Sequence, residues 1–388
     1  MNFDQIINRR GTYSNKWDDM HSSYGVSPDD GLAMWVADMD FQSPDCVQHA
    51  VKKMLDHGIY GYSSGTFPYE EAVCCWLRNR HGWAIEPDWI DTTTGLSNAI
   101  ALVLDTFSKP GDRVVLFSPV YHAFKKVVLA AGREITVCPL EKVDNQYKMN
   151  FSAYDEVMTG QEKIALLCSP HNPGGRVWTQ AELRETGEFC RKHDLLLVSD
   201  EIHQDLVFPG HKHIPFPVAA PEFVDRLIVL SSASKTFNLA GTHTGQVIIP
   251  DQDLRKQFKK RISELSLGRN DFGVAMTTAA YSPEGAAWLD KLVCYLDGNR
   301  KLFDAGVNGI AGVSSMPMGA TYLSWVDFSQ TGLSQEEVAT RIYQQAKIAA
   351  NAGETFGKGG ELHVRFNTGT SRELIRDAVT RLERAFVN

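Results

Sequence analysis

The stretch KIALLCSPHNPGGRVW, residues 163–178, decides the fold class. It opens with an apolar run, KIALLCS, and continues into a loop rich in proline and glycine. The run LLLVSD (195–200) has the same character and also leads into a polar loop. Runs that are apolar on both faces are typical of central parallel strands that helices cover on both sides. The sequence therefore predicts an α/β domain whose sheet is mostly parallel.

Short apolar runs alternate with helical stretches on both sides of this segment. We predict further strands at residues 91–95, 113–117, 134–140, 227–232 and 245–250. We predict helices at residues 96–107, 121–131, 179–192 and 251–266. The helix at 179–192 also has a capping signal, because Thr179 precedes its first turn and Glu182 stands three residues later.

The pattern changes after residue 280. We predict a long helix at 286–310, then strands at 321–328 and 361–367 and helices near 334–346 and at 371–386. This order is typical of a smaller α+β domain. The first 45 residues show no strand–helix alternation, and we assign them to that domain. The prediction is a large domain over 46–285 and a small domain formed by 1–45 and 286–388.

Composition and charge argue against several classes of protein. The chain has 388 residues, of which 43% are hydrophobic and 22% charged, as in ordinary globular proteins. A net charge of −8 argues against nucleic-acid binding and against a polybasic membrane patch. No apolar run approaches the roughly 20 residues of a membrane helix, and no apolar signal core is found near the N-terminus. Seven scattered cysteines without a CxxC pair favour a cytoplasmic protein over a disulfide framework or a zinc site.

Several well-known motifs do not occur. No GxGxxG follows a strand, as a dinucleotide dehydrogenase requires, and no GxSxG marks a hydrolase. HKH (211–213) is more often a surface feature than a metal site in such a proline-rich loop, so we predict no metal. Ser232 and Lys235 form the SxxK pattern of serine β-lactamase-like enzymes, although SDN-like and KTG-like elements are missing. A serine acylase therefore stays an alternative.

Lys235 lies in SSASKTFNLAG (231–241), a run of small residues at a predicted strand end. A lysine amine becomes nucleophilic when desolvation or nearby cations lower its pKa, and it then condenses with carbonyl groups. Pyridoxal 5′-phosphate (PLP) is the common partner of such a lysine. This cofactor requires an acid at its ring nitrogen, a donor to its ring oxygen, a stacked side chain and a phosphate cup.

The loops after the predicted strands supply a candidate for each requirement, since ligands of open parallel sheets bind beyond the carboxyl ends of the strands. Asp200 can pair with the ring nitrogen, Asn172 can donate to the ring oxygen, and Tyr121 can stack on the ring. The phosphate candidates are backbone amides at a helix start and nearby hydroxyls, namely Gly95, Leu96, Ser97, Ser232 and Ser234. Each residue alone also has an ordinary structural explanation, and the case depends on their joint presence.

The order of these motifs resembles the fold-type I PLP-dependent enzymes, the class I/II aminotransferase superfamily. The stretches MWVADMDF (34–41), HGIYGYSSG (57–65), SDEIHQD (199–205) and SKTFNLAG (234–241) look closest to MalY/PatB-type cystathionine β-lyases, which are carbon–sulfur lyases. The resemblance implies a three-layer α/β/α large domain with a mostly parallel sheet, a smaller α+β domain and PLP as the cofactor.

The resemblance also implies roles for individual residues. Lys235 would bind the cofactor covalently, and Arg365 would bind the substrate carboxylate together with Asn172 and Tyr121. Tyr62 would reach the phosphate of a neighbouring subunit in a homodimer with a shared active site. Two positions depart from the usual aminotransferase, since His243 and His203 stand where many members have arginine and tyrosine. We keep His203 among the cofactor-binding residues, and the balance of the phosphate charge stays open.

The predicted reaction is β-elimination from a sulfur-containing L-amino acid, giving a thiol, pyruvate and ammonia. Lys235 would remove the α-proton while Asp200 stabilises the cofactor ring. A PLP-dependent aminotransferase of the same fold is the alternative, and a cofactor-bearing regulatory binding protein is a more distant one. The sequence leaves the substrate open among cystathionine, cystine, cysteine and S-substituted cysteines.

Overall fold

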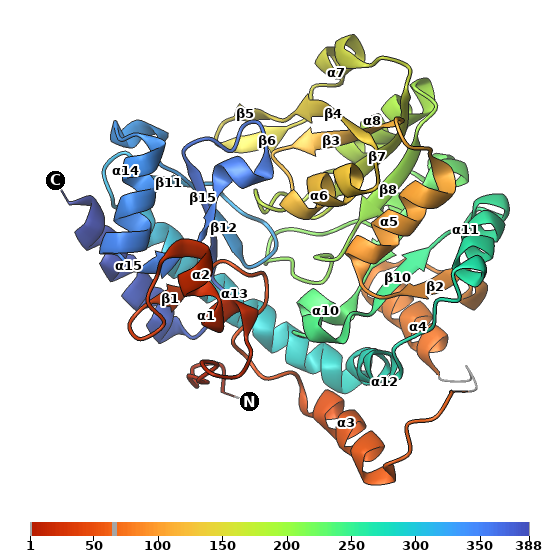
Figure 1. Ribbon diagram of the computed structural model, residues 1–388, viewed down its shortest axis with the longest axis horizontal. Helices are drawn as coiled ribbons and strands as arrows, with labels where there is room; N and C mark the ends of the chain where they lie inside the picture. The colour runs from red at the N-terminus through yellow and green to blue at the C-terminus, as the bar shows by residue number, and fades with distance from the viewer. Residues whose placement is uncertain (1, 64–67, 388) are drawn as a thin grey trace.

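The large sheet of the computed structural model has seven strands, and the described residues are 2–63 and 68–387 (Figure 1). In spatial order the strands are β2 (Ile90–Thr93), β10 (Gly245–Ile248), β9 (Leu227–Ser231), β8 (Leu196–Asp200), β7 (Glu162–Cys168), β3 (Arg113–Ser118) and β4 (Glu134–Pro139). β10 is antiparallel to both of its neighbours, and the other pairs are parallel. The predicted mostly parallel sheet is therefore confirmed, and each predicted strand falls on one of these.

Two hydrophobic cores cover the two faces of this sheet. Along β3, Val114 and Leu116 belong to the core beneath α5 (Leu96–Phe107), α6 (His122–Ala130) and α11 (Gln252–Glu264). Val115 and Phe117 belong to the opposite core, with α4 (Tyr69–His81), α8 (Gln180–Lys192) and α13 (Pro283–Val307). Because side chains alternate along a strand, a strand that is apolar throughout requires this three-layer arrangement.

A second, antiparallel sheet lies next to the C-terminal helices. Its strands in order are β11 (Ser314–Ser315), β12 (Leu323–Asp327), β15 (His363–Asn367) and β14 (Asn351–Ala352). The helices of this region are α14 (Gln335–Thr340), which continues as one π-helical turn over Arg341–Gln345, and α15 (Arg372–Phe386). The long predicted helix is present, but it begins three residues earlier, at Pro283, because Ser282 caps it.

The N-terminal segment joins this smaller sheet region. β1 (Leu32–Ala33) pairs in parallel with β13 (Ile348–Ala349), and Figure 1 shows α1, α2 and β1 beside the C-terminal elements. This pairing supports the division into 46–285 and 1–45 with 286–388, which stays a prediction. The remaining elements are α1 (Asn15–Asp18), α2 (Met20–Tyr24), α3 (Asp45–His57), β5 (Glu141–Val143), β6 (Gln146–Lys148), α7 (Phe151–Val157), α9 (Phe216–Ala219), α10 (Ala233–Thr236) and α12 (Asp271–Ala280).

The fold brings distant loops to one edge of the large sheet. β7, β8 and β9 run in parallel with Cys168 beside Asp200 and Asp200 beside Leu230, so the loops that follow them emerge together. The 34–41 segment, MWVADMDF, runs between this edge and the smaller sheet. Asn238 binds its Met39 carbonyl, and Asn367 of β15 binds its Val36 and Asp38 carbonyls. Among the described residues, none of the helices has the length and hydropathy to cross a membrane.

Candidate active site

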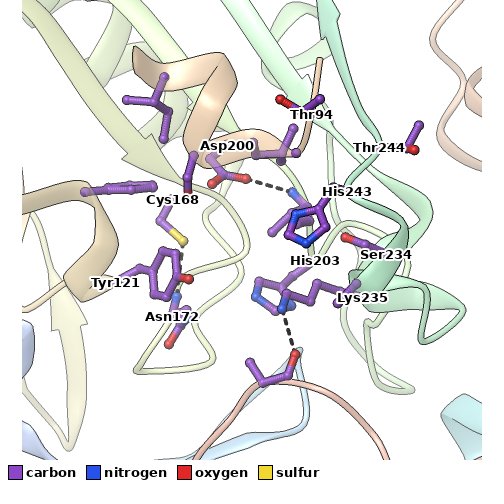
Figure 2. Close-up of a pocket in the computed structure, with 18 residues that line it drawn as sticks. Thr94, Tyr121, Cys168, Asn172, Asp200, His203, Ser234, Lys235, His243 and Thr244 are labelled. Carbon is purple, nitrogen blue, oxygen red and sulfur yellow. Dashed lines mark hydrogen bonds between the residues drawn. The ribbon is translucent and has the colours of Figure 1, made fainter. Parts of the chain in front are cut away.

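A cavity of about 260 Å³ lies at the carboxyl ends of β7, β8 and β9 (Figure 2). Nine of the twelve predicted site residues line it: Gly95, Leu96, Ser97, Tyr121, Asn172, Asp200, His203, Ser234 and Lys235. They come from five separate loops, and the parallel sheet is what gathers them. The three predicted residues outside the lining are Ser232, Arg365 and Tyr62.

Lys235, on the short helix α10, projects its amine into the cavity. The Nζ atom donates a hydrogen bond of 2.7 Å to the Ala37 carbonyl, which also accepts from the Tyr322 hydroxyl at 3.0 Å. The pKa of Lys235 is lowered to about 8, mainly by burial and also by the charge of Arg365, while Asp38 and Asp200 oppose the shift. A pKa of about 8 leaves a substantial fraction of the amine neutral near pH 8, so Lys235 can act as a nucleophile or a base.

Asp200 ends β8 and faces the same cavity. It is buried, and burial raises the pKa of its carboxyl to about 7, although the Ile202 amide donates to Oδ1 at 3.1 Å. A buried carboxyl of this kind is stabilised in its ionised form by a cation placed against it. The protonated nitrogen of a pyridine ring would be such a cation.

His203 also lines the cavity and is buried, and its ring centroid lies 6.4 Å from that of Tyr322. Burial, with the charges of Lys235 and Arg365, lowers the pKa of His203 to about 3, so its imidazole is neutral at working pH. Its Nδ1 atom is buried and has no hydrogen-bond partner in the part of the chain that the structure describes. A buried ring nitrogen without a partner is costly, and a ligand atom could satisfy it.

Arg365 of β15 lies behind Asn172 and is buried. Its guanidinium donates to Asn172 Oδ1 at 3.0 Å, to Asn351 Oδ1 at 2.6 Å and to the Trp35 carbonyl at 2.8 Å. These partners are neutral, and burial lowers the pKa of Arg365 to about 10. A buried guanidinium with neutral partners favours the arrival of an anion such as a carboxylate. Since Asn172 accepts with its oxygen, its amide nitrogen can donate toward the cavity.

The start of α5 forms one end of the cavity. Gly95 precedes the helix with φ +85°, and no side chain caps the first turn. The first amides of a helix attract anions such as phosphate. Ser234 lines the same cavity (Figure 2).

Ser232 was predicted as a hydroxyl for the phosphate, but its side chain points elsewhere. Its Oγ donates to the Thr244 carbonyl at 2.7 Å and accepts from the Ser234 amide at 3.1 Å, so it caps α10. Ser232 thus shapes the loop that carries Lys235. The same geometry removes the basis of the serine acylase alternative, because Lys235 donates to Ala37 while Ser232 donates to Thr244.

Tyr121 and Tyr62 differ in where the structure places them. Tyr121 precedes α6 and lines the cavity across from Lys235 and Ser234 (Figure 2), where it can stack on a flat ligand. Tyr62 lies on the segment after α3, is fully exposed, and is not part of the cavity of its own chain. Its role toward a neighbouring subunit stays a prediction.

Sequence reasoning missed part of the cavity wall. Cys168 ends β7 and lines the cavity, so the rule that named Asp200 at the end of β8 could have found it. Ala37 lies in the 34–41 segment, which has no helical or strand periodicity. The further lining residues that we did not predict are Thr94, Ile100, Phe124, Ile202, Ala240, His243 and Thr244.

The donor set of the cavity fits PLP. Among the residues that the structure describes, Asp200 forms no salt bridge, although the charge of Lys235 acts on it, and Nδ1 of His203 has no hydrogen-bond partner. No side chain caps the first turn of α5 there either. These groups match a ring nitrogen, a ring substituent and a phosphate, and Lys235 supplies the amine for an aldehyde.

Comparison with known proteins gives consistent results. Residues 33–382 match the family described as aminotransferase class I and II. The chain is 39% identical over 388 residues to cystathionine beta-lyase PatB of Bacillus subtilis, covering 99% of this chain and 100% of PatB. It is 29% identical to protein MalY of Escherichia coli, covering 98% and 97%. The structure of cystalysin from Treponema denticola, which contains PLP, superposes with a TM-score of 0.94 at 32% identity, covering 99% and 98%.

Proposed function

Because the chain belongs to the class I and II aminotransferase family, we propose that it is a PLP-dependent carbon–sulfur lyase of the cystathionine β-lyase type. One observation carries the proposal: the Lys235 amine, the Asp200 carboxyl and the Asn172–Arg365 pair converge at one cavity. This arrangement supports chemistry on an amino acid, because the Lys235 amine can form a covalent bond and the Arg365 guanidinium can bind a carboxylate. The enzyme would act in amino-acid metabolism.

Each residue has one task toward the cofactor. Lys235 would hold its aldehyde carbon, Asp200 would pair with its ring nitrogen, and Asn172 and His203 would contact its ring oxygen. Tyr121 stacks on the ring, and Gly95, Leu96, Ser97 and Ser234 surround the phosphate. When bound, PLP would supply an electron-withdrawing ring, which is the chemistry that weakens the bond between the substrate α-carbon and its hydrogen.

The chain's own residues supply orientation and proton transfer. Arg365 binds the substrate carboxylate through its planar fork, which fixes the α-carbon in front of Lys235. Lys235, as a neutral amine, takes the α-proton, and its pKa of about 8 suits it to both uptake and release of that proton. Asp200 remains ionised while positive charge stands against it, and this preorganised charge lowers the barrier.

The second stage expels the sulfur. The C–S bond breaks and its electron pair leaves with the sulfur, which takes up a proton to become the thiol. The three-carbon remainder reacts with one water and yields pyruvate and ammonium. In balance, one S-substituted cysteine and one water give one thiol, one pyruvate and one ammonium ion, and no oxidant is required.

We infer a homodimer from the surface around Tyr62. Ile59, Tyr60 and Tyr62 are 73%, 61% and 109% exposed, and a groove of about 650 Å³ lies beside them between α3 and α12. Exposed apolar surface of this kind favours a protein interface. With a second copy bound at this groove, Tyr62 of each copy would lie toward the cavity of the other. Each active site of the dimer would then contain residues of both copies. Seven free cysteines support our proposal of a cytoplasmic location.

Pyruvate release tests the proposal. Wild-type protein with PLP is offered cystathionine, cystine, cysteine and S-alkyl cysteines, and amino-group transfer to added keto acids is measured in parallel. We expect pyruvate with little transfer, and Lys235→Ala should lose turnover and the visible absorbance of lysine-bound cofactor. Lys212→Ala, an exposed lysine, is the control. Efficient amino transfer without pyruvate would establish the aminotransferase alternative, and full turnover in Lys235→Ala would refute the mechanism.

A further inference from the structure

The phosphate end of the cavity lacks an obvious cation. Among the described residues that line the cavity, only Lys235, His203 and His243 have basic side chains. A phosphate monoester carries between one and two negative charges near neutral pH, and an uncompensated anion in a partly closed site is unfavourable. One of these three side chains should therefore face the phosphate.

Two of the three are committed elsewhere. Lys235 bonds the aldehyde carbon in the proposed function. His203 is buried and has a pKa lowered to about 3, so its imidazole carries no charge. Its ring lies beside that of Tyr322, with the ring centroids 6.4 Å apart, and the charge of Arg365 acts on it, so it faces the side of the cavity assigned to the ring oxygen. His243 is the remaining candidate.

His243 stands next to the uncapped start of α5. A Cβ built on Gly95 would lie 3.9 Å from His243 Nδ1 and 4.0 Å from its Cα. Figure 2 shows the His243 ring inside the cavity, in the region of Thr94, Ser234 and Thr244. For the residues that the structure describes, no hydrogen bond or ion pair of the His243 side chain is present, and the residue is exposed, so its nitrogens are open to solvent or to a ligand.

The backbone holds His243 in an unusual conformation. Its φ is +47°, in the left-handed region that non-glycine residues seldom adopt. Both neighbours are anchored: the Thr242 carbonyl accepts from Asn270 Nδ2 at 2.7 Å, and the Thr244 carbonyl accepts from Ser232 Oγ at 2.7 Å. Strain that the surroundings impose in this way clusters at ligand sites. Here it directs an imidazole toward the start of α5.

We propose that His243 binds the phosphate of PLP, as the side-chain donor that joins the amides of Gly95–Ser97 and the Ser234 hydroxyl. The proposal rests on the proposed function and deepens it, because it assigns a side-chain contact to the phosphate. A side-chain donor at this position would contact the phosphate but not the ring. Removing the His243 side chain should therefore weaken the binding of the phosphorylated cofactor more than the binding of its unphosphorylated form.

The test compares PLP with pyridoxal, which has the same ring and aldehyde but no phosphate. The full-length protein is freed of cofactor and titrated with each ligand, and binding is followed by tryptophan fluorescence. Since a hydrogen bond to a charged group changes an equilibrium constant by about 10- to 100-fold, His243→Ala should weaken PLP binding by about that factor. Pyridoxal binding should change less than about 3-fold, since the ring contacts are intact. His211→Ala, which removes an exposed histidine, is the matched control.

Two further variants make the outcome decisive. His243→Gln, which keeps a donor, should recover part of the PLP affinity, and His243→Arg should recover it fully or exceed wild type. Equal loss for PLP and pyridoxal would show that His243 only supports the fold of its loop, and no loss for either would place the phosphate elsewhere. Both results overturn the proposal. A wild-type protein that binds neither ligand would instead overturn the proposed function.

Discussion

Asp205 anchors the helix that carries Lys235, and its removal should be costly. Its side chain is 1% exposed. Oδ1 accepts from Trp76 Nε1 at 3.1 Å and is 2.8 Å from His81 Nε2, and Oδ2 accepts from Thr236 Oγ1 at 2.8 Å. Thr236 follows Lys235 directly, while Trp76 and His81 belong to α4. One carboxylate therefore ties α4 to the Lys235 segment.

The three hydrogen bonds set the size of the effect. A buried donor that loses its acceptor costs about 1–3 kcal/mol. The Thr236 hydroxyl can rotate to another acceptor, but the Trp76 nitrogen is fixed by its stack on Tyr281, whose ring centroid is 4.7 Å away. For Asp205→Ala we therefore expect a free energy of unfolding lower by about 3–5 kcal/mol. Asp205→Asn keeps the volume and one acceptor, and its loss should be about 1–2 kcal/mol.

Urea denaturation of the cofactor-free protein, followed by fluorescence, measures these differences. Asp56→Ala is the control, since Asp56 forms an exposed i,i+4 pair with Lys52 and its removal should cost less than about 0.5 kcal/mol. If the free energies of unfolding of Asp205→Ala and Asp56→Ala differ by less than about 1 kcal/mol, the buried hydrogen bonds of Asp205 do not stabilise the protein as predicted.

Two other predictions concern buried charge. Because burial lowers the pKa of Lys235 from 10.5 to about 8, the unfolded chain binds more protons between these values, so the stability of cofactor-free protein should rise from pH 8 to pH 10. Lys235→Met should abolish this rise, as measured by urea denaturation, and should raise the free energy of unfolding at pH 7 by up to about 3 kcal/mol. An unchanged dependence of stability on pH would contradict the prediction. Burial also raises the pKa of Asp91 to about 6, and its Oδ2 has no partner among the described residues. Asp91→Asn should therefore stabilise the protein by about 1–2 kcal/mol at pH 8 but not at pH 4, as measured by urea denaturation at both pH values.

The large sheet was predictable because its strands are apolar on both faces. A parallel sheet between two layers of helices buries both faces of such strands. The runs KIALLCS and LLLVSD were therefore sufficient to place Asp200 and the loop of Asn172 at one edge of the sheet. Lys235 followed from the next strand, β9, by the same rule. Strand ends are local features of the sequence, and a parallel sheet converts them into neighbours in space.

The parts that the residues alone did not reveal depend on contacts between distant segments. Nothing local in the 34–41 segment indicates that its Ala37 carbonyl meets Lys235, 198 residues away. Ser232 was misassigned because a serine beside a phosphate site and a serine that caps a helix look alike in sequence, and only the Thr244 carbonyl decides between them. Arg365 was known only by resemblance, since a buried arginine on a strand becomes recognisable once its neutral partners are seen.

In the proposed mechanism, the charges in the site would let substrate binding raise the basicity of Lys235 when it must accept a proton. The positive charge of Arg365 is one of the causes that hold the pKa of Lys235 down, while Asp38 and Asp200 act in the opposite direction. A substrate carboxylate at Arg365 cancels that positive charge, and the pKa of Lys235 then rises. Lys235 is therefore least basic before the substrate arrives, when a neutral amine is required to bond the cofactor. It is most basic with the carboxylate in place, when it must take the α-proton. In the proposed mechanism, Arg365 would therefore both orient the substrate and adjust the basicity of Lys235.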